Sequence, residues 1–224
     1  NKDNSKNFKL MRTSLKNTNQ KNWKDVIEHR KKILLEGIEI FNDFLVVIER
    51  DSGLVKMNVR KWDNSQNYYL PIEGETYSLS IGTNIDFKST KLRYNFSSLN
   101  TPSSVIDFDM ETKSFDVKKK QEVVDDNFNE ANYITERLWA KSHDGTKIAI
   151  SLIRHNETKL NDRTPLLLYG YGSYGITLDP YFSTVRLSLL NRGFVYAIAH
   201  IRGSEYLGRD WYAVSYTHLR AHET

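Results

Sequence analysis

The chain has 224 residues and no cysteine, and its 32 basic and 28 acidic residues leave a formal net charge of +4. It can therefore form neither a disulfide nor a thiolate metal site. No stretch reaches the ~18 consecutive apolar residues of a membrane span. The basic excess is not gathered in one place, since the lysine run from Lys118 is followed by Glu122, Asp125 and Asp126. We expect neither a nucleic-acid nor a membrane partner, and a reducing, cytoplasmic location.

Up to about Asn132 the sequence alternates short strand patterns with polar turns. In residues 54–60, apolar Val55, Met57 and Val59 alternate with polar residues, which is typical of a half-buried strand. Further strands are expected at residues 33–41, 44–49, 77–81, 92–96, 105–110 and 115–118. Strands spaced by ~8–12 residues predict a β-sandwich, barrel or propeller, and groups of four match the ~40–45 residues of a propeller blade. The segment 23–32 can include a short helix.

From Tyr133 the pattern changes to that of an α/β domain. Strands are expected at residues 137–141 and 147–153, on either side of a glycine-containing hairpin turn. Residues 165–169 form an apolar run without alternation, which predicts a strand buried on both faces, as in a parallel sheet. Residues 194–199 repeat that pattern, so a second buried strand is expected there.

A helix is expected between these two apolar strands. Ser183 can cap it, it runs to about Arg192, and Gly193 ends it. Val185, Leu189 and Arg192 share one stripe, which Leu187 and Leu190 widen on its apolar side. Strand, glycine-rich loop, helix and strand form one βαβ unit. The second half of the chain therefore begins an α/β domain whose sheet it does not complete.

The loop at residues 170–175 has the spacing G-x-G-x-x-G, which also occurs in dinucleotide-binding folds. That function needs a helix to begin at the last glycine, where its dipole meets the pyrophosphate. Here the loop continues to Pro180, two tyrosines crowd the positions that must approach phosphate, and His200 rather than an acidic residue follows the second strand. We expect no cofactor, and a cofactor titration would test the alternative.

The same loop fits an oxyanion-binding role, because in α/β-hydrolases the loop after an early strand supplies a donor to the tetrahedral intermediate. Tyr171 and Tyr174 are the candidate side chains, and the alternative is that both are amphipathic packing residues. Ser173 and Ser204 are not nucleophile candidates, since G-x-S-x-G occurs nowhere in the chain. The nucleophile elbow of an α/β-hydrolase is therefore absent.

A metal site at the carboxyl end of the chain is also disfavoured. His218 and His222 are four residues apart and precede Glu223, a spacing that can place two ligands on one helix face. The order H-E-x-x-H of a zinc peptidase is absent. We expect no metal.

Several stretches resemble the oligopeptidase B branch of the prolyl oligopeptidase family of serine peptidases. They cover nearly the whole chain from Asn7 to Tyr212 and comprise residues 7–13, 34–37, 68–71, 101–107, 166–175, 186–190, 192–197 and 200–203. The resemblance is much more specific than any single motif.

The resemblance implies a seven-bladed β-propeller that caps an α/β-hydrolase domain. Residues 1–132 would be the last part of the propeller, and residues 133–213 the start of the peptidase domain. The match stops after Tyr212. Residues 214–224 resemble translated sequencing adaptor, so we expect them to be a non-native tail on a truncated fragment.

The resemblance also implies roles for two residues of the glycine-rich loop. Tyr171 stands where the family has its oxyanion donor, and Tyr174 stands where an aromatic residue lines the primary specificity pocket. The Ser-His-Asp triad would lie beyond this chain, and the substrates would be short peptides cut after Arg or Lys. The family usually has Arg-Gly-Gly where this chain has Arg202-Gly203-Ser204. If that position needs a positive φ, Ser204 strains the turn.

Three alternatives remain open. The chain could belong to a prolyl oligopeptidase-like or aminoacyl peptidase of the same family, because the carboxylates that select basic residues would lie downstream. It could be a non-catalytic β-propeller interaction module, or a nucleotide-binding α/β protein. Residues 1–224 as written are expected to have no peptidase activity, because an oxyanion donor without a nucleophile leaves the main chemical step unassisted.

Overall fold

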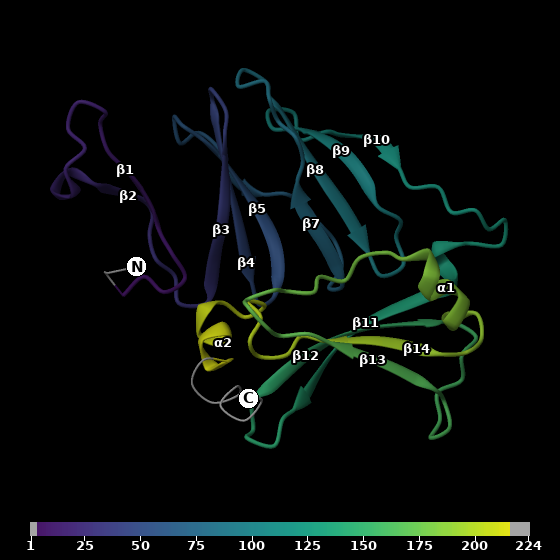
Figure 1. The fold of residues 1–224 in the computed structure, drawn as a ribbon. Helices are drawn as coiled ribbons and strands as arrows, with labels where there is room; N and C mark the ends of the chain where they lie inside the picture. The colour runs from purple at the N-terminus through teal and green to yellow at the C-terminus, as the bar shows by residue number, and fades with distance from the viewer. Residues whose placement is uncertain (1–3, 216–224) are drawn as a thin grey trace.

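The computed structural model describes residues 4–215, and over this range the chain forms one two-stranded and three four-stranded β-sheets (Figure 1). The two-stranded sheet pairs β1 (Leu10–Arg12) with β2 (Lys24–Ile27), and a 3-10 turn at Gln20–Asn22 lies between them. The short helix expected within residues 23–32 is not formed. Ile27 pairs with Leu10 and is buried against Leu45 and Val47, so tertiary packing selects a strand.

Two four-stranded antiparallel sheets follow, each with its strands in chain order. The first contains β3 (Ile33–Ile40), β4 (Phe44–Asp51), β5 (Leu54–Lys61) and β6 (Asn67–Tyr69). The second contains β7 (Tyr77–Ile81), β8 (Lys91–Ser98), β9 (Ser104–Asp109) and β10 (Phe115–Lys120). Both match the expected groups of four strands.

The two sheets share one apolar core. Its buried members come from alternate positions of the strands, as the period of two predicts, and include Val55, Met57, Val59, Phe108 and Met110. The β4–β5 hairpin turns on Ser52 and Gly53, which have φ angles of 52° and 88°. Two positive φ angles are what a tight two-residue hairpin requires. This turn faces the second half of the molecule (Figure 1).

The last four-stranded sheet is mixed. Its order is β11 (Tyr133–Lys141), β12 (Lys147–His155), β14 (Val195–Ala199) and β13 (Leu166–Gly170). A 3-10 turn at Glu130–Asn132 leads into β11. Strands β13 and β14 are parallel and are joined through α1 (Thr184–Leu190), which confirms the expected βαβ unit. A final short helix, α2 (Arg209–Val214), closes the described part of the chain.

Two expectations about this unit are wrong. Strand β13 is not buried on both faces: Leu166 and Leu168 are 55% and 56% exposed, because β13 is the edge of the sheet. Strand β14, paired on both sides, is buried as predicted. On α1, Leu187 and Leu190 form the buried face, whereas Val185 is 78% exposed. Among residues 4–215, no helix is long and apolar enough to cross a membrane.

Candidate active site

The glycine-rich loop lies where β13 and β14 end. Since parallel strands end at the same edge of a sheet, the loop after Gly170 meets the loop after Ala199. The Gly175 amide donates to the Gly203 carbonyl at 3.0 Å, and the Glu205 amide donates to the Gly175 carbonyl at 3.2 Å. Residues 170–177 and 201–206 are therefore bound to each other through their backbones.

Glycine is required on both sides of this contact. A Cβ atom added at Gly172 would lie 2.3 Å from the carbonyl oxygen of Arg202. Gly203 has a φ of 96°, and a Cβ there would lie 1.7 Å from the carbonyl oxygen of Gly172. Any larger residue at either position would force the loops apart, so the glycine spacing serves this close approach.

The two candidate tyrosines lie on this loop. Tyr171 is 37% exposed, between the strand end and the Gly172 contact. Tyr174 is 72% exposed and has a φ of 59°, a conformation that residues with a side chain seldom adopt. Helix α1 begins only at Thr184, so the last glycine of the loop is not at a helix N-terminus, which a dinucleotide-binding loop needs.

Ser204 does not strain its turn. It is absent from the residues with positive φ, and Gly203 adopts that conformation instead. The Ser204 hydroxyl donates to the carbonyl of Ile201 at 2.9 Å and accepts from the Tyr206 amide at 3.4 Å. Position 204 does not need a positive φ, so the condition for strain at Ser204 is not met, and its hydroxyl stabilises the turn.

A serine–histidine contact that the sequence did not suggest lies beneath this edge. The Ser151 hydroxyl and His200 Nε2 are 2.8 Å apart, within hydrogen-bonding distance of each other as in a nucleophile and its base. Both side chains are buried, so a substrate cannot reach them. Burial, with the nearby charges of Arg137 and Arg50, lowers the pKa of His200 to about 3. So weak a base suits a structural hydrogen bond, not proton transfer at neutral pH.

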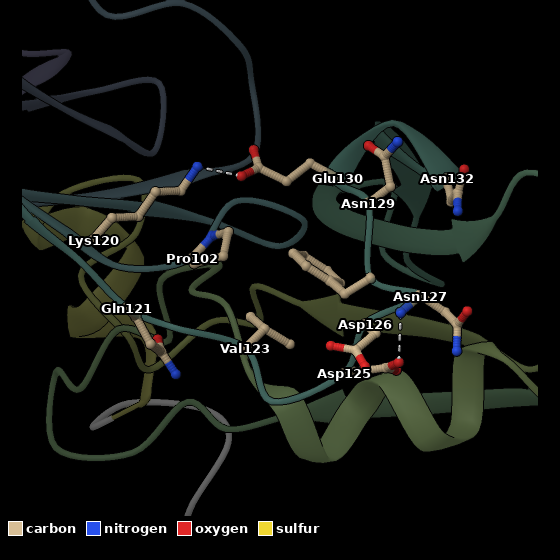
Figure 2. Close-up of a pocket in the computed structure, with 11 residues that line it drawn as sticks. Pro102, Lys120, Gln121, Val123, Asp125, Asp126, Asn127, Asn129, Glu130 and Asn132 are labelled. Atoms are coloured by element: carbon tan, nitrogen blue, oxygen red, sulfur yellow. Dashed lines mark hydrogen bonds and ion pairs between the residues drawn. The ribbon is translucent and has the colours of Figure 1, made fainter.

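A separate cavity lies elsewhere, around the segment that joins β10 to β11 (Figure 2). It has a volume of about 700 Å³ and is lined largely by acidic and amide side chains, among them Asp125, Asp126 and Asn129. The Lys120 ammonium donates to Glu130 at 2.5 Å, and the backbone amide of Asn127 donates to the Asp125 carboxylate at 3.0 Å. These interactions order the segment itself.

No metal centre is found in the part of the chain that the structure describes: residues 4–215 hold no group of three His, Asp or Glu side chains placed for one ion. The histidine pair His218 and His222 lies outside those residues.

Two antiparallel blades followed by a βαβ sheet define a β-propeller joined to the start of an α/β-hydrolase domain. Comparison with known families agrees: the model of the prolyl oligopeptidase N-terminal β-propeller domain matches residues 1–121, and the model of the prolyl oligopeptidase family matches residues 180–224. The chain belongs to the prolyl oligopeptidase family.

The curated relatives are peptidases by name. Dipeptidyl aminopeptidase BI of Pseudoxanthomonas mexicana is 38% identical over 95% of this chain and 29% of its own length. Protease 2 of Moraxella lacunata is 28% identical over 92% of this chain and 29% of its own length. The chain thus spans less than a third of these relatives.

Solved structures show the same fold. Oligopeptidase B from Trypanosoma brucei with covalently bound antipain has a TM-score of 0.80 and 32% identity, over 85% of this chain and 28% of the other. Oligopeptidase B from Leishmania major has a TM-score of 0.79 and 31% identity over 85% of this chain and 28% of the other.

Proposed function

We propose that the chain is part of a serine oligopeptidase that hydrolyses short peptides after Arg or Lys. In this proposal residues 1–132 belong to the propeller and residues 133–213 to the peptidase domain, with the Ser-His-Asp triad outside the chain. Residues 214–224 as a non-native tail and a cytoplasmic location both remain predictions. The identity to two oligopeptidase B structures supports cleavage after basic residues.

The main support for this proposal is the glycine-rich loop at residues 170–175, which backbone hydrogen bonds hold in place. When a serine attacks a peptide carbonyl, negative charge develops on its oxygen, and a fixed donor stabilises that charge more than it stabilises the substrate. Tyr171 lies on a loop bound by backbone hydrogen bonds, so its hydroxyl can be held in place before the reaction. Tyr174, more exposed and three residues later, would line the pocket for the residue before the cleaved bond.

The test is made on the longer protein to which this chain is proposed to belong. Tyr171→Phe removes the donor and keeps the ring, so kcat should fall by ~10²–10³ with little change in KM. The probe is an N-acylated peptide aminomethylcoumarin with Arg before the scissile bond. Tyr169→Phe is the matched control, since it removes a hydroxyl two residues earlier, on strand β13, and should leave kcat near that of the unmodified enzyme.

An unchanged kcat in Tyr171→Phe would refute the oxyanion role. Residues 1–224 expressed alone serve as the negative control and should show no burst of product. If the longer protein cleaves no peptide at all, the result favours the alternative that the chain belongs to a non-catalytic β-propeller interaction module.

A second activity is favoured by one observation, the 38% identity to dipeptidyl aminopeptidase BI. An enzyme of that kind needs a free amino terminus on its substrate, whereas an oligopeptidase accepts a blocked one. Comparing free and N-acylated forms of the same Arg-containing aminomethylcoumarin peptide therefore separates the two. A proline-containing analogue tests the prolyl alternative.

A further inference from the structure

Arg50 reaches from the propeller into the peptidase domain. It lies on β4 and is 6% exposed. Its Nη1 and Nη2 donate to the two carboxylate oxygens of Asp179 at 2.7 Å and 3.0 Å. Its Nε donates to Glu36 on β3 at 2.5 Å, and Nη1 also donates to the carbonyl of Gly53 at 3.0 Å. A bidentate pair of this kind fixes orientation as well as distance.

The buried charge of Arg50 is stabilised by its two carboxylate partners, Asp179 and Glu36. Burial acts against the charged form of Arg50, but the hydrogen bonds and charges of Asp179 and Glu36 outweigh it and raise the pKa of Arg50 well above its ordinary value. The Asp179 side chain is 23% exposed and that of Glu36 is 27% exposed. Removing the guanidinium would leave two partly buried carboxylates without their cation.

Asp179 lies on the loop that carries both tyrosines, between the end of β13 and the start of α1. The loop begins at Gly170, where β13 fixes it, and its middle is held through Gly175 by the hydrogen bonds to residues 203 and 205. The Thr177 hydroxyl accepts a further hydrogen bond from the Glu205 amide at 3.2 Å. The ion pair to Arg50 is the next anchor along the chain, and its partner lies on a different domain.

A second contact places Arg50 beside the peptidase domain. The Tyr206 ring is fully buried and stacks on His200 with centroids 3.8 Å apart. A Cβ added at Gly53 would lie 2.2 Å from this ring, so the β4–β5 turn packs directly on it. Arg137 also donates a hydrogen bond to the carbonyl of Ser52. The β4–β5 turn, which accepts a hydrogen bond from Arg50, is therefore in direct contact with Tyr206 and Arg137 of the peptidase domain.

We propose that Arg50 is a positioning residue of the peptidase: through Asp179 it holds the glycine-rich loop, and with it Tyr171, at the place where the oxyanion forms. The oxyanion donor then depends on a propeller residue, and docking of the propeller and ordering of the loop favour each other. This proposal rests on the proposed role of Tyr171.

The test uses Arg50→Met, Asp179→Asn and the double variant in the longer protein. Because misplacing a catalytic group by ~1 Å can reduce the rate ~10²-fold, kcat should fall at least about tenfold in each variant while KM changes by less than about twofold. The double variant should be no slower than the slower single variant, since both substitutions remove one interaction. Asp179→Asn keeps the size of the side chain, so it guards against loss of folding in Arg50→Met.

Arg93→Met is the matched control. Arg93 also makes a bidentate contact to an aspartate, through Nε and Nη2 to Asp107 at 2.7 Å and 2.8 Å, but both residues lie within one blade. Its kcat should stay near that of the unmodified enzyme. An equal loss of kcat in Arg93→Met would overturn the proposal.

Hydrogen exchange gives a readout that does not depend on activity. The amides of residues 170–179 should exchange faster in Arg50→Met and Asp179→Asn than in the unmodified protein, and not in Arg93→Met. Unchanged exchange there overturns the role of Arg50 whatever the kinetics show. If the unmodified protein cleaves no peptide but exchange responds as expected, the peptidase proposal fails while the Arg50 anchor stands.

Discussion

His200 shows how burial changes the chemistry of one side chain. Its backbone amide donates to Ala149, its ring stacks on Tyr206, and its Nε2 lies within hydrogen-bonding distance of the Ser151 hydroxyl. Burial, together with the charges of Arg137 and Arg50, disfavours the imidazolium, so the residue is neutral in the folded protein. A histidine next to a serine is therefore no evidence of a catalytic pair without access and a usable pKa.

The same shift predicts a pH dependence of stability. The pKa of His200 is about 3 when folded and 6.5 in its ordinary state. Above pH 6.5 its titration does not lower the free energy of unfolding. As the pH falls from 6.5 towards 3, only the unfolded chain binds the proton, so the free energy of unfolding decreases. The slope is about 1.4 kcal/mol per pH unit. His200→Phe keeps a ring stacked on Tyr206 but cannot be protonated. Between pH 6.5 and 4.5 its free energy of unfolding, measured by urea denaturation, should decrease by about 2–3 kcal/mol less than that of the unmodified protein. Parallel curves for the two proteins would contradict this.

Two glycines with positive φ, one on each side of β14, have different surroundings. Gly203 has a φ of 96° and is packed against Gly172, whereas Gly193, which follows α1, has a φ of 83° and nothing within 4 Å of an added Cβ. Both positions favour glycine by conformation, but only Gly203 is also restricted by space.

The two alanine variants should therefore differ. Gly193→Ala should cost about 1–2 kcal/mol, the penalty for a left-handed L-residue. Gly203→Ala adds a backbone clash that cannot relax without separating the loops, so its cost should exceed ~3 kcal/mol. Thermal and urea unfolding of the two variants give the comparison. Equal losses would mean that the loops can move apart freely.

At the scale of the whole molecule, the described residues leave strand β13 open. Leu166, Leu167, Leu168 and Tyr169 are all at least 44% exposed along an unpaired sheet edge. Exposed apolar strand edges favour pairing with other chains. This follows from β13 being the outermost strand of the mixed sheet among residues 4–215.

We expect residues 1–224 expressed alone to self-associate, and Leu168→Lys to increase the monomeric fraction by charging that edge. Val185→Lys is the control, because Val185 is equally apolar and more exposed but lies on α1. Sedimentation velocity at micromolar concentration measures the fraction. A monomeric parent chain, or an equal response to both lysines, would show that the edge is not responsible.

The sequence by itself located most of the strands and α1, because alternation in β5 and the apolar runs at β13 and β14 are local patterns. It also located the loop with Tyr171 and Tyr174, since glycine spacing is readable without coordinates; their roles stay proposals. Tertiary structure decided what local pattern cannot. Residues Lys24–Ile27 form a strand because they pair with β1. Strand β13 is exposed because it lies at the edge of the sheet. Ser204 is not strained because Gly203 adopts the positive φ of that turn. The Arg50–Asp179 pair joins residues 129 positions apart, so only the folded chain could bring them together.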